Sequence, residues 1–240
     1  MTADGRPLVI ARRGASAEAP ENTIAAFELA LAQGADGILL EVHLSQDNHP
    51  VVINDFTLEH TTDGTGPVRQ LTVRELKRLD AGGWRGRRFR GQRIQTLQEV
   101  FERFRDRARF WIELRGAADL YPGIEECVVS TVEIYEMLDR ALLQSVDLAT
   151  LTGIRSLNHE LRVAQIVRDQ ASHIGLDAVH AVCLDVHRPQ ENLVAETLAA
   201  GLDCYVGTVD EPAEMERLVR KGVTGIITDR PEWARKWLGH

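Results

Sequence analysis

The sequence has few cysteines, no long apolar run and no excess of basic residues. Its three cysteines, Cys127, Cys183 and Cys204, are odd in number and widely spaced, so they indicate free thiols rather than a disulfide framework or a zinc site. No run approaches the roughly 20 apolar residues that cross a bilayer, and the first residues lack the basic-then-apolar pattern of a signal peptide. We therefore expect a cytoplasmic protein with no transmembrane segment.

The charge balance disfavours nonspecific binding of nucleic acid, although a local basic patch remains possible. Against 36 acidic residues there are 28 Lys and Arg, a net charge of -8, whereas the phosphate backbone of a nucleic acid selects basic surfaces. We therefore expect no nucleic-acid partner. A composition of 44% apolar residues, 19 Gly and 8 Pro among 240 residues excludes disordered and collagen-like chains. This length suits one large domain or two small ones and leaves the oligomeric state open.

Short β-branched runs alternate with helix-period segments along the whole chain, which is typical of parallel strands joined by crossover helices. The run at 50–53 follows its predecessor too closely for a crossover helix, so a hairpin-like excursion is expected there. The other expected strands are 8–11, 38–44, 109–114, 145–149, 162–167, 177–182, 203–206 and 225–228, and the clearest expected helices are 22–33 and 211–221.

About eight such alternations in 240 residues favour a (β/α)8 barrel of the TIM type that spans residues 1–240 as a single domain. A doubly wound open sheet would give similar local signals. The stretch 80–93 is polar, glycine-rich and arginine-rich, and we expect a mobile loop or insertion there, within a broader loop or insertion around 56–93.

Charged or amide side chains lie at or near the ends of the expected strands: Arg12, Arg13, Glu41, His43, Asn54, Asp55, Glu113 and Arg115. In a parallel barrel these ends meet at one rim, where the chemistry of the fold takes place. Such a cluster can bind an anion such as phosphate or hold a divalent cation between carboxylates. It can also be a closed network of ion pairs without a ligand.

Several motifs resemble those of the glycerophosphodiester phosphodiesterase family, and they occur in the family's order. They are Arg13-Gly14-Ala15-Ser16, Pro20-Glu21-Asn22-Thr23, Gly34-Ala35-Asp36-Gly37-Ile38, Pro50-Val51-Val52-Ile53 before Asp55, Thr61 to Gly66, Ile112-Glu113-Leu114 and Gly225 to Pro231. The resemblance spans nearly the whole chain. It implies the family's barrel and the family's reaction, in which a phosphoric diester hydrolase releases glycerol 3-phosphate and an alcohol with the help of Mg or Ca.

The positions that the resemblance assigns to acid and base carry the wrong side chains. The family has a histidine before the Arg-Gly of the first strand and another before the aspartate at position 55, and here these positions hold Arg12 and Asn54. Arginine stays protonated and an amide has no useful proton affinity. Loss of one acid–base partner costs about 10² to 10⁴ in rate. Arg13 and Asp55, which directly follow these two positions, are the other catalytic candidates.

The metal site implied by the resemblance is also altered. The family's carboxylates on the second strand and on a later strand fall at Leu39, Glu41 and Glu113. A hard divalent cation prefers several oxygen ligands, so the loss at position 39 weakens the site. We hypothesise that the Arg12 guanidinium occupies the place of the cation and pairs with both glutamates. The family's lysine after the last glutamate is Arg115.

Three functions fit these residues. The first is a divergent phosphodiesterase that uses Asp55 or His43 as a base. The second is a noncatalytic protein of lipid or phosphodiester metabolism that grips a small phosphoester with Arg12, Arg13 and Arg115. The third is an interaction subunit whose barrel mouth is closed by its own ion pairs. The missing proton-transfer groups favour the last two, which predicts a pseudoenzyme with lost or strongly reduced hydrolysis.

Overall fold

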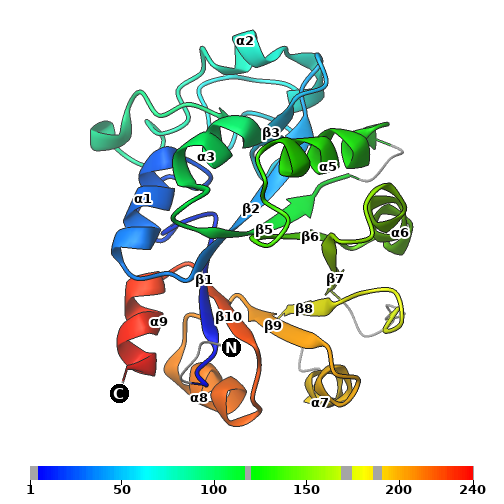
Figure 1. Cartoon of the computed structure of the whole chain (residues 1–240). Coiled ribbons are helices and arrows are strands. Elements are labelled where there is room, and N and C mark those ends of the chain that lie inside the picture. The colour runs from blue at the N-terminus through cyan, green and yellow to red at the C-terminus, as the bar shows by residue number, and fades with distance from the viewer. Residues whose placement is uncertain (1–4, 117–119, 169–174, 186–190, 240) are drawn as a thin grey trace.

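Parallel strands close into a barrel in the centre of the molecule (Figure 1). In the part of the chain that is described, eight strands form it: β1 (Leu8–Arg12), β2 (Gly37–Leu44), β5 (Arg109–Leu114), β6 (Ala141–Ser145), β7 (Arg162–Val167), β8 (Ala181–Asp185), β9 (Asp203–Gly207) and β10 (Gly225–Thr228). The barrel is closed because β1 pairs with both β10 and β2. This confirms the predicted (β/α)8 barrel and single domain and excludes the open sheet.

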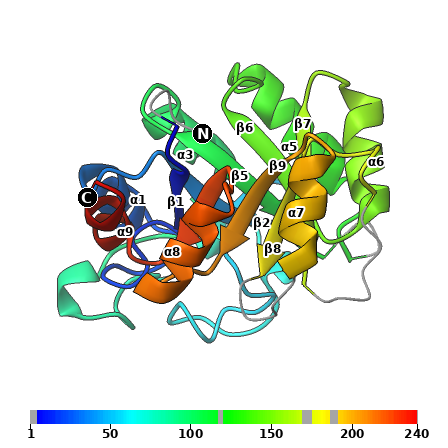
Figure 2. The ribbon, with the colours of Figure 1, turned by 90° about the horizontal axis from the view of Figure 1, so that it is seen from below.

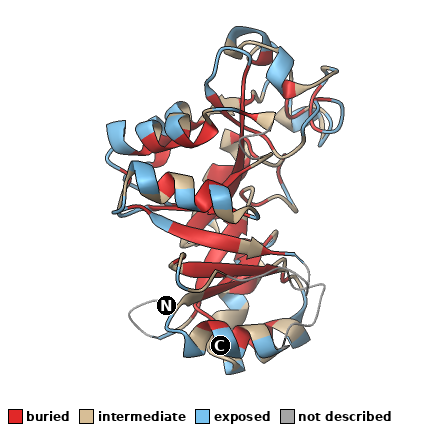
Figure 3. Ribbon diagram, turned by 90° about the vertical axis from the view of Figure 1, so that its right-hand side faces the viewer, coloured by how far each residue is buried: buried red, intermediate tan, exposed pale blue. Residues whose placement is uncertain are grey.

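The structure is a computed structural model that describes residues 5–116, 120–168, 175–185 and 191–239. Its main helices lie around the outside of the barrel (Figure 1): α1 (Ile24–Ala32), α3 (Leu97–Phe104), α5 (Ile124–Ile134), α6 (Leu148–Leu157), α7 (Glu191–Ala199), α8 (Pro212–Arg220) and α9 (Pro231–Leu238). Figure 3 shows buried strands inside and helices whose outer faces are exposed. None of the described helices has the length and apolar character that crossing a bilayer takes.

The first and last helices lie side by side (Figure 2). Arg235 of α9 forms an ion pair with Asp36 at 2.7 Å and donates to the Gly34 carbonyl at the end of α1. Asp36 in turn accepts from the backbone N–H of Val9 at 2.8 Å. These contacts join the two ends of the sequence where the barrel closes.

Apolar side chains fill much of the barrel interior. Ile10, Leu39, Trp111, Tyr205 and Ile227 belong to one buried cluster inside it, and the rings of Trp111 and Tyr205 meet edge to face at 5.3 Å between centroids. The charged side chains described below lie toward the carboxyl ends of the strands, beyond this apolar cluster, where a site can form.

Two of the strands expected from the sequence are misplaced. The expected strand at 145–149 is wrong, because β6 has already ended at Ser145 and α6 begins at Leu148. The Asp147 carboxylate accepts from the backbone N–H of Thr150 at 2.8 Å, and such a cap begins a helix within the apolar run. The strand expected at 177–182 lies instead at Ala181–Asp185. The other expected strands and both helices agree with the structure to within two residues.

The predicted hairpin-like excursion is confirmed: β3 (Pro50–Val52) runs antiparallel to β2, and β4 (Gln95–Thr96) pairs with β3. Residues 53–94 form a segment between β3 and β4 that we call the excursion, with η1 (Val68–Gln70), α2 (Val73–Leu76) and η2 (Arg87–Phe89). It has a small apolar core of its own, which includes Leu58, Val68, Leu76 and Ile94.

Candidate functional site

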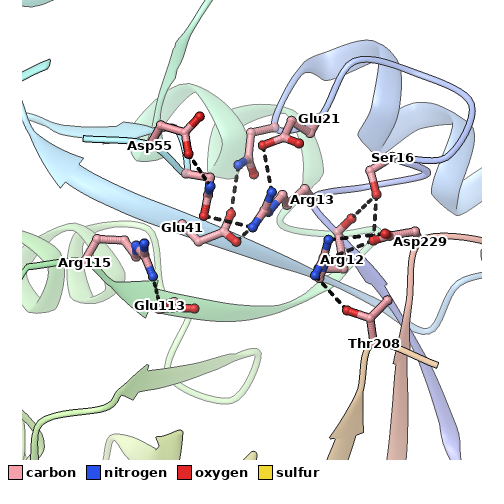
Figure 4. Close-up of polar contacts among 12 residues, drawn as sticks. Arg12, Arg13, Ser16, Glu21, Glu41, Asp55, Glu113, Arg115, Thr208 and Asp229 are labelled. Carbon is pink, nitrogen blue, oxygen red and sulfur yellow. Dashed lines mark hydrogen bonds and ion pairs between the residues drawn. The ribbon is translucent and has the colours of Figure 1, made fainter. Parts of the chain in front are cut away.

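A cavity of about 390 Å³ opens at the carboxyl end of the barrel. Seven side chains singled out in the sequence line it: Arg12, Arg13, Leu39, Glu41, Asn54, Glu113 and Arg115. The cavity also contains Arg168, Asp185 and Thr208, which the sequence reasoning had not singled out. Figure 4 shows how five of them, Arg12, Arg13, Glu41, Glu113 and Arg115, converge from separate strand ends.

Arg13 is the centre of a buried polar cluster (Figure 4). Its guanidinium donates to Glu41 at 2.7 Å, to Glu21 at 2.9 Å and to the Asn54 side-chain oxygen at 2.9 Å. The other oxygen of Glu41 accepts from the Asn22 amide at 2.8 Å. Burial by itself lowers the pKa of Arg13, but the charges of Glu41 and Glu21 outweigh this and hold the pKa above its usual value. Both oxygens of Glu41 are therefore engaged.

Arg12 contacts the opposite wall of the mouth. Its guanidinium donates to both carboxylate oxygens of Asp229, at 2.9 and 3.2 Å, and to the Thr208 hydroxyl at 2.7 Å. Ser16 donates to the same carboxylate at 2.9 Å. The hypothesis that Arg12 pairs with Glu41 and Glu113 is therefore wrong. Asp229, just beyond β10, lies next to the end of β1 because these two strands are paired.

Two arginines converge on Glu113. Arg115 and Arg168 donate to the same oxygen, Oε1, at 2.8 and 2.7 Å. The Arg115 guanidinium also lies over the Phe56 ring, 5.4 Å from its centroid. The face of an aromatic ring attracts a positive charge, so this contact stabilises the guanidinium. Two guanidinium groups thus share one oxygen of Glu113, and a further carboxylate, that of Asp185, also lines the cavity.

The corner at Asn54 has a carboxylate and an imidazole beside it. The Asn54 amide donates to Asp55 at 2.7 Å, and the other oxygen of Asp55 lies 3.0 Å from Nδ1 of His60. Asp55 does not line the cavity itself. His60 carried no motif signal in the sequence, because its distance of five residues from Asp55 follows no regular strand or helix face.

His43 is fully buried behind Asn54 rather than at the cavity surface. Its Nε2 lies 3.0 Å from the Asn54 carbonyl, and its Nδ1 lies 2.8 Å from the Tyr121 hydroxyl. Because a carbonyl can only accept, Nε2 carries the hydrogen and Nδ1 accepts from Tyr121. Burial lowers the pKa of His43 to about 4. Both ring nitrogens are occupied, so this arrangement does not offer a base to the cavity.

His43 is expected to make stability depend on pH. Its pKa is about 4 in the fold and about 6.5 in an unfolded chain, so the unfolded state binds more protons between these values. The free energy of unfolding is then unaffected by His43 above about pH 6.5. It falls by on the order of 3 kcal/mol as the pH drops toward 4, because protonation of His43 favours the unfolded state. Urea unfolding of the unmodified protein and of His43→Gln at several pH values measures this. Parallel losses in both proteins would contradict it.

The mouth does not fit a divalent cation. Leu39 offers no oxygen, both oxygens of Glu41 are bonded to Arg13 and Asn22, and Glu113 is held by two arginines. Among the residues that the structure describes, no group of three His, Cys, Asp or Glu side chains is placed to hold a metal ion. A cation at this place would meet guanidinium groups that already neutralise both carboxylates.

Arg168 and Asp229 were not singled out from the sequence, although they lie at strand ends like the residues that were. Arg168 comes directly after β7, and Asp229 directly after β10. Both are charged residues at the carboxyl end of a barrel strand, like Arg12 and Arg115. Asp229 even belongs to one of the motifs quoted for the resemblance, so strand-end position was the signal that could have identified both.

Fold and cavity together define a (β/α)8-barrel protein with an arginine-lined mouth. The sequence matches the Glycerophosphoryl diester phosphodiesterase family over residues 13–233. It is 38% identical over 232 residues to a glycerophosphodiester phosphodiesterase of Caldanaerobacter subterraneus, covering 95% of this chain and 96% of the relative. The chain therefore belongs to the glycerophosphodiester phosphodiesterase family.

Solved structures agree with this assignment. The glycerophosphodiester phosphodiesterase of Agrobacterium tumefaciens superposes with a TM-score of 0.83 at 32% identity, over 95% of this chain and 99% of that one. A phosphodiesterase of Oleispira antarctica, solved in complex with the product sn-glycerol-3-phosphate, gives a TM-score of 0.91 at 27% identity, over 99% and 98% of the two chains. Members of this family generally depend on a divalent cation, a property that the residues at this mouth do not match.

Proposed function

We propose that the chain binds a small phosphoester at the barrel mouth and does not hydrolyse it. One observation carries the proposal: Arg115 and Arg168 share a single oxygen of Glu113. Two guanidinium groups that converge on one carboxylate oxygen can also donate N–H groups to a phosphate placed between them. Guanidinium groups suit this task because their fixed N–H pairs match phosphate oxygens.

The similarity to known proteins supports this class of ligand. The Oleispira antarctica phosphodiesterase holds sn-glycerol-3-phosphate, and we propose the same kind of ligand, a glycerol phosphomonoester or a glycerophosphodiester, for the cavity here. Arg12 and Arg13 line the cavity beside Arg115, and in this proposal their remaining N–H groups donate to the phosphate. Such a ligand would give the protein a role in lipid or phosphodiester metabolism.

The proposal that hydrolysis is lost rests on proton transfer. A phosphodiester needs one group that takes a proton from the nucleophile and another that gives one to the leaving alkoxide. The corners to which the family resemblance assigns these tasks carry Arg12 and Asn54, which are held by Asp229 and by Arg13. Of the two alternatives named from the sequence, His43 has both nitrogens occupied, and Asp55 does not line the cavity.

Glu113→Gln is expected to tighten the binding of glycerol 3-phosphate. In the proposed complex the Glu113 carboxylate competes with the phosphate for Arg115 and Arg168, and like-charge repulsion in a partly solvated site is on the order of 1 to 3 kcal/mol. Removing that charge should lower the Kd about tenfold. Calorimetric titration in the presence of a chelator measures the effect.

Arg115→Gln is the matched opposite variant, because it removes one of the two cations that Glu113 holds. We expect it to raise the Kd by a factor of about 10 to 100, since a hydrogen bond to a charged group contributes about 1.5 to 3 kcal/mol. Weaker binding in Glu113→Gln would show instead that this carboxylate takes part in holding the ligand. If the unmodified protein bound no glycerol 3-phosphate at millimolar concentration, the phosphoester proposal would be wrong. The interaction subunit whose mouth is closed by its own ion pairs would then be the remaining function.

Slow hydrolysis is a second candidate function, favoured by the contact between His60 and Asp55 at 3.0 Å. An imidazole oriented by a carboxylate can act as acid or base, and this pair lies next to Asn54. Release of glycerol 3-phosphate from glycerophosphocholine, with added Mg or Ca, would reveal it. His60→Gln should abolish such turnover, whereas His49→Gln, an exposed histidine outside the mouth, should not.

A further inference from the structure

Residues 84–90 of the excursion present four exposed arginines and one exposed indole, and we call them the arginine-rich loop. The side chains are Trp84, Arg85, Arg87, Arg88 and Arg90. Trp84 is 41% exposed, and it is one of few large hydrophobic residues with so much exposed surface. A tryptophan left in water beside several cations is unusual, because burial would stabilise the indole.

The arginines of this loop differ from other exposed arginines of the chain in their partners. None of its four arginines forms an ion pair with a carboxylate in the described part of the chain. Exposed arginines elsewhere do so: Arg103 and Arg107 both pair with Glu28. The chain as a whole has a net charge of -8, so the loop is a local exception to an acidic protein.

The loop has a defined shape. The Asp80 carboxylate accepts from the backbone N–H groups of Gly82 and Gly83 with one oxygen and of Gly91 with the other, at 2.7 to 2.9 Å. Arg88 donates to the Glu18 carbonyl in the turn between β1 and α1. The arginines are therefore presented together before any partner binds, which reduces the entropy cost of binding.

The loop lies at the same end of the barrel as the cavity. Figure 2 shows the excursion, in cyan and blue-green, on the side of the molecule toward which the parallel strands run, and η2 protrudes there. The Trp84 ring stacks on His60 at 6.1 Å between centroids, and His60 contacts Asp55 next to the cavity lining. A surface that meets the loop would thus face the barrel mouth.

We propose that the arginine-rich loop docks the protein on an anionic phospholipid surface. Clustered cations gain about a factor of five in partitioning for each charge near such a surface, and an indole is most stable at the level of the headgroups. Nucleic acid is the competing polyanion in the test below, because its phosphate backbone also selects clustered cations. The proposal is independent of what the cavity binds.

The test is sedimentation with vesicles of 30% phosphatidylserine in phosphatidylcholine, next to vesicles of pure phosphatidylcholine. We expect the unmodified protein to bind the anionic vesicles only, and Arg87→Gln/Arg90→Gln to bind them about 25-fold more weakly. The matched control is Arg220→Gln/Lys236→Gln, which removes the same charge from α8 and α9 and should keep full binding. Trp84→Ala should weaken binding without changing its dependence on phosphatidylserine.

Several outcomes would overturn the proposal. They are absence of binding to the anionic vesicles, equal losses in the loop variant and the control variant, and stronger binding of poly-uridylate RNA than of vesicles. Neither arginine of the loop variant lines the cavity, so thermal unfolding and glycerol 3-phosphate titration of that variant should match the unmodified protein. This separates a lost docking surface from a lost fold and from the phosphoester proposal.

Discussion

The triple variant Arg12→His/Leu39→Glu/Asn54→His is expected to hydrolyse glycerophosphocholine at least about 10² times faster than the unmodified protein, and up to about 10⁴ times or more. It restores both proton-transfer groups and one metal-ligand position that the family resemblance assigns to these sites. It also removes the guanidinium group that is bonded to Asp229 and Thr208. The measurement is release of glycerol 3-phosphate in the presence of Mg or Ca.

The controls separate proton transfer from metal binding. Arg12→His/Asn54→His without the change at Leu39 tests whether the third carboxylate matters, and the Caldanaerobacter subterraneus relative serves as the positive control for the assay. If the unmodified protein turned over substrate near the rate of the triple variant, the proposed loss of hydrolysis would be wrong. Activity removed by His60→Gln would then identify the group that replaced the missing histidines.

The second large effect is on stability. Arg13→Met is expected to lower the free energy of unfolding by about 3 to 5 kcal/mol, the usual cost of leaving one member of a buried ion pair without its partner. The Glu41 side chain is only 3% exposed and depends on Arg13 for its main charge contact. Chemical denaturation at neutral pH measures the loss.

Arg12→Met is the matched comparison. The neighbouring Arg12 is also paired with a carboxylate, but its side chain is 33% exposed and that of Asp229 is 23% exposed. Solvent screens this pair, so we expect a loss of no more than about 1 kcal/mol. Equal losses in the two variants would contradict the role of burial. Arg13→Met/Glu41→Gln should be less destabilised than Arg13→Met, because the unpaired charge is gone.

The sequence predicted which residues gather at the mouth because strand register follows from alternation and pairing. Glu41 and Glu113 are register partners on β2 and β5, and Arg12 pairs with Leu39 across β1 and β2. Side chains two residues apart on a strand share a face. Placing charged and amide residues at the strand ends was therefore enough to bring six of the lining residues together.

The sequence did not predict which arginine contacts which carboxylate. The hypothesis drawn from the family resemblance placed Arg12 at the position of the cation, where it would pair with Glu41, but the structure pairs Glu41 with Arg13 instead. Arg13 has a φ of 59°, in the left-handed region, so the chain turns sharply at the end of β1. That turn brings the Arg13 side chain back toward β2 and leaves Arg12 to contact Asp229.

The amino-acid order alone determined the barrel, the excursion after β2 and the absence of histidine at the two corners, because these depend on local periodicity and on residue identity. Tertiary structure alone decided that Arg168 and Asp229 join the mouth, that His43 is sealed between Asn54 and Tyr121, and that Glu113 serves two arginines. Closure of the barrel places residues from distant parts of the chain within hydrogen-bond reach, and ion pairing at such distances depends on side-chain directions that no local pattern encodes.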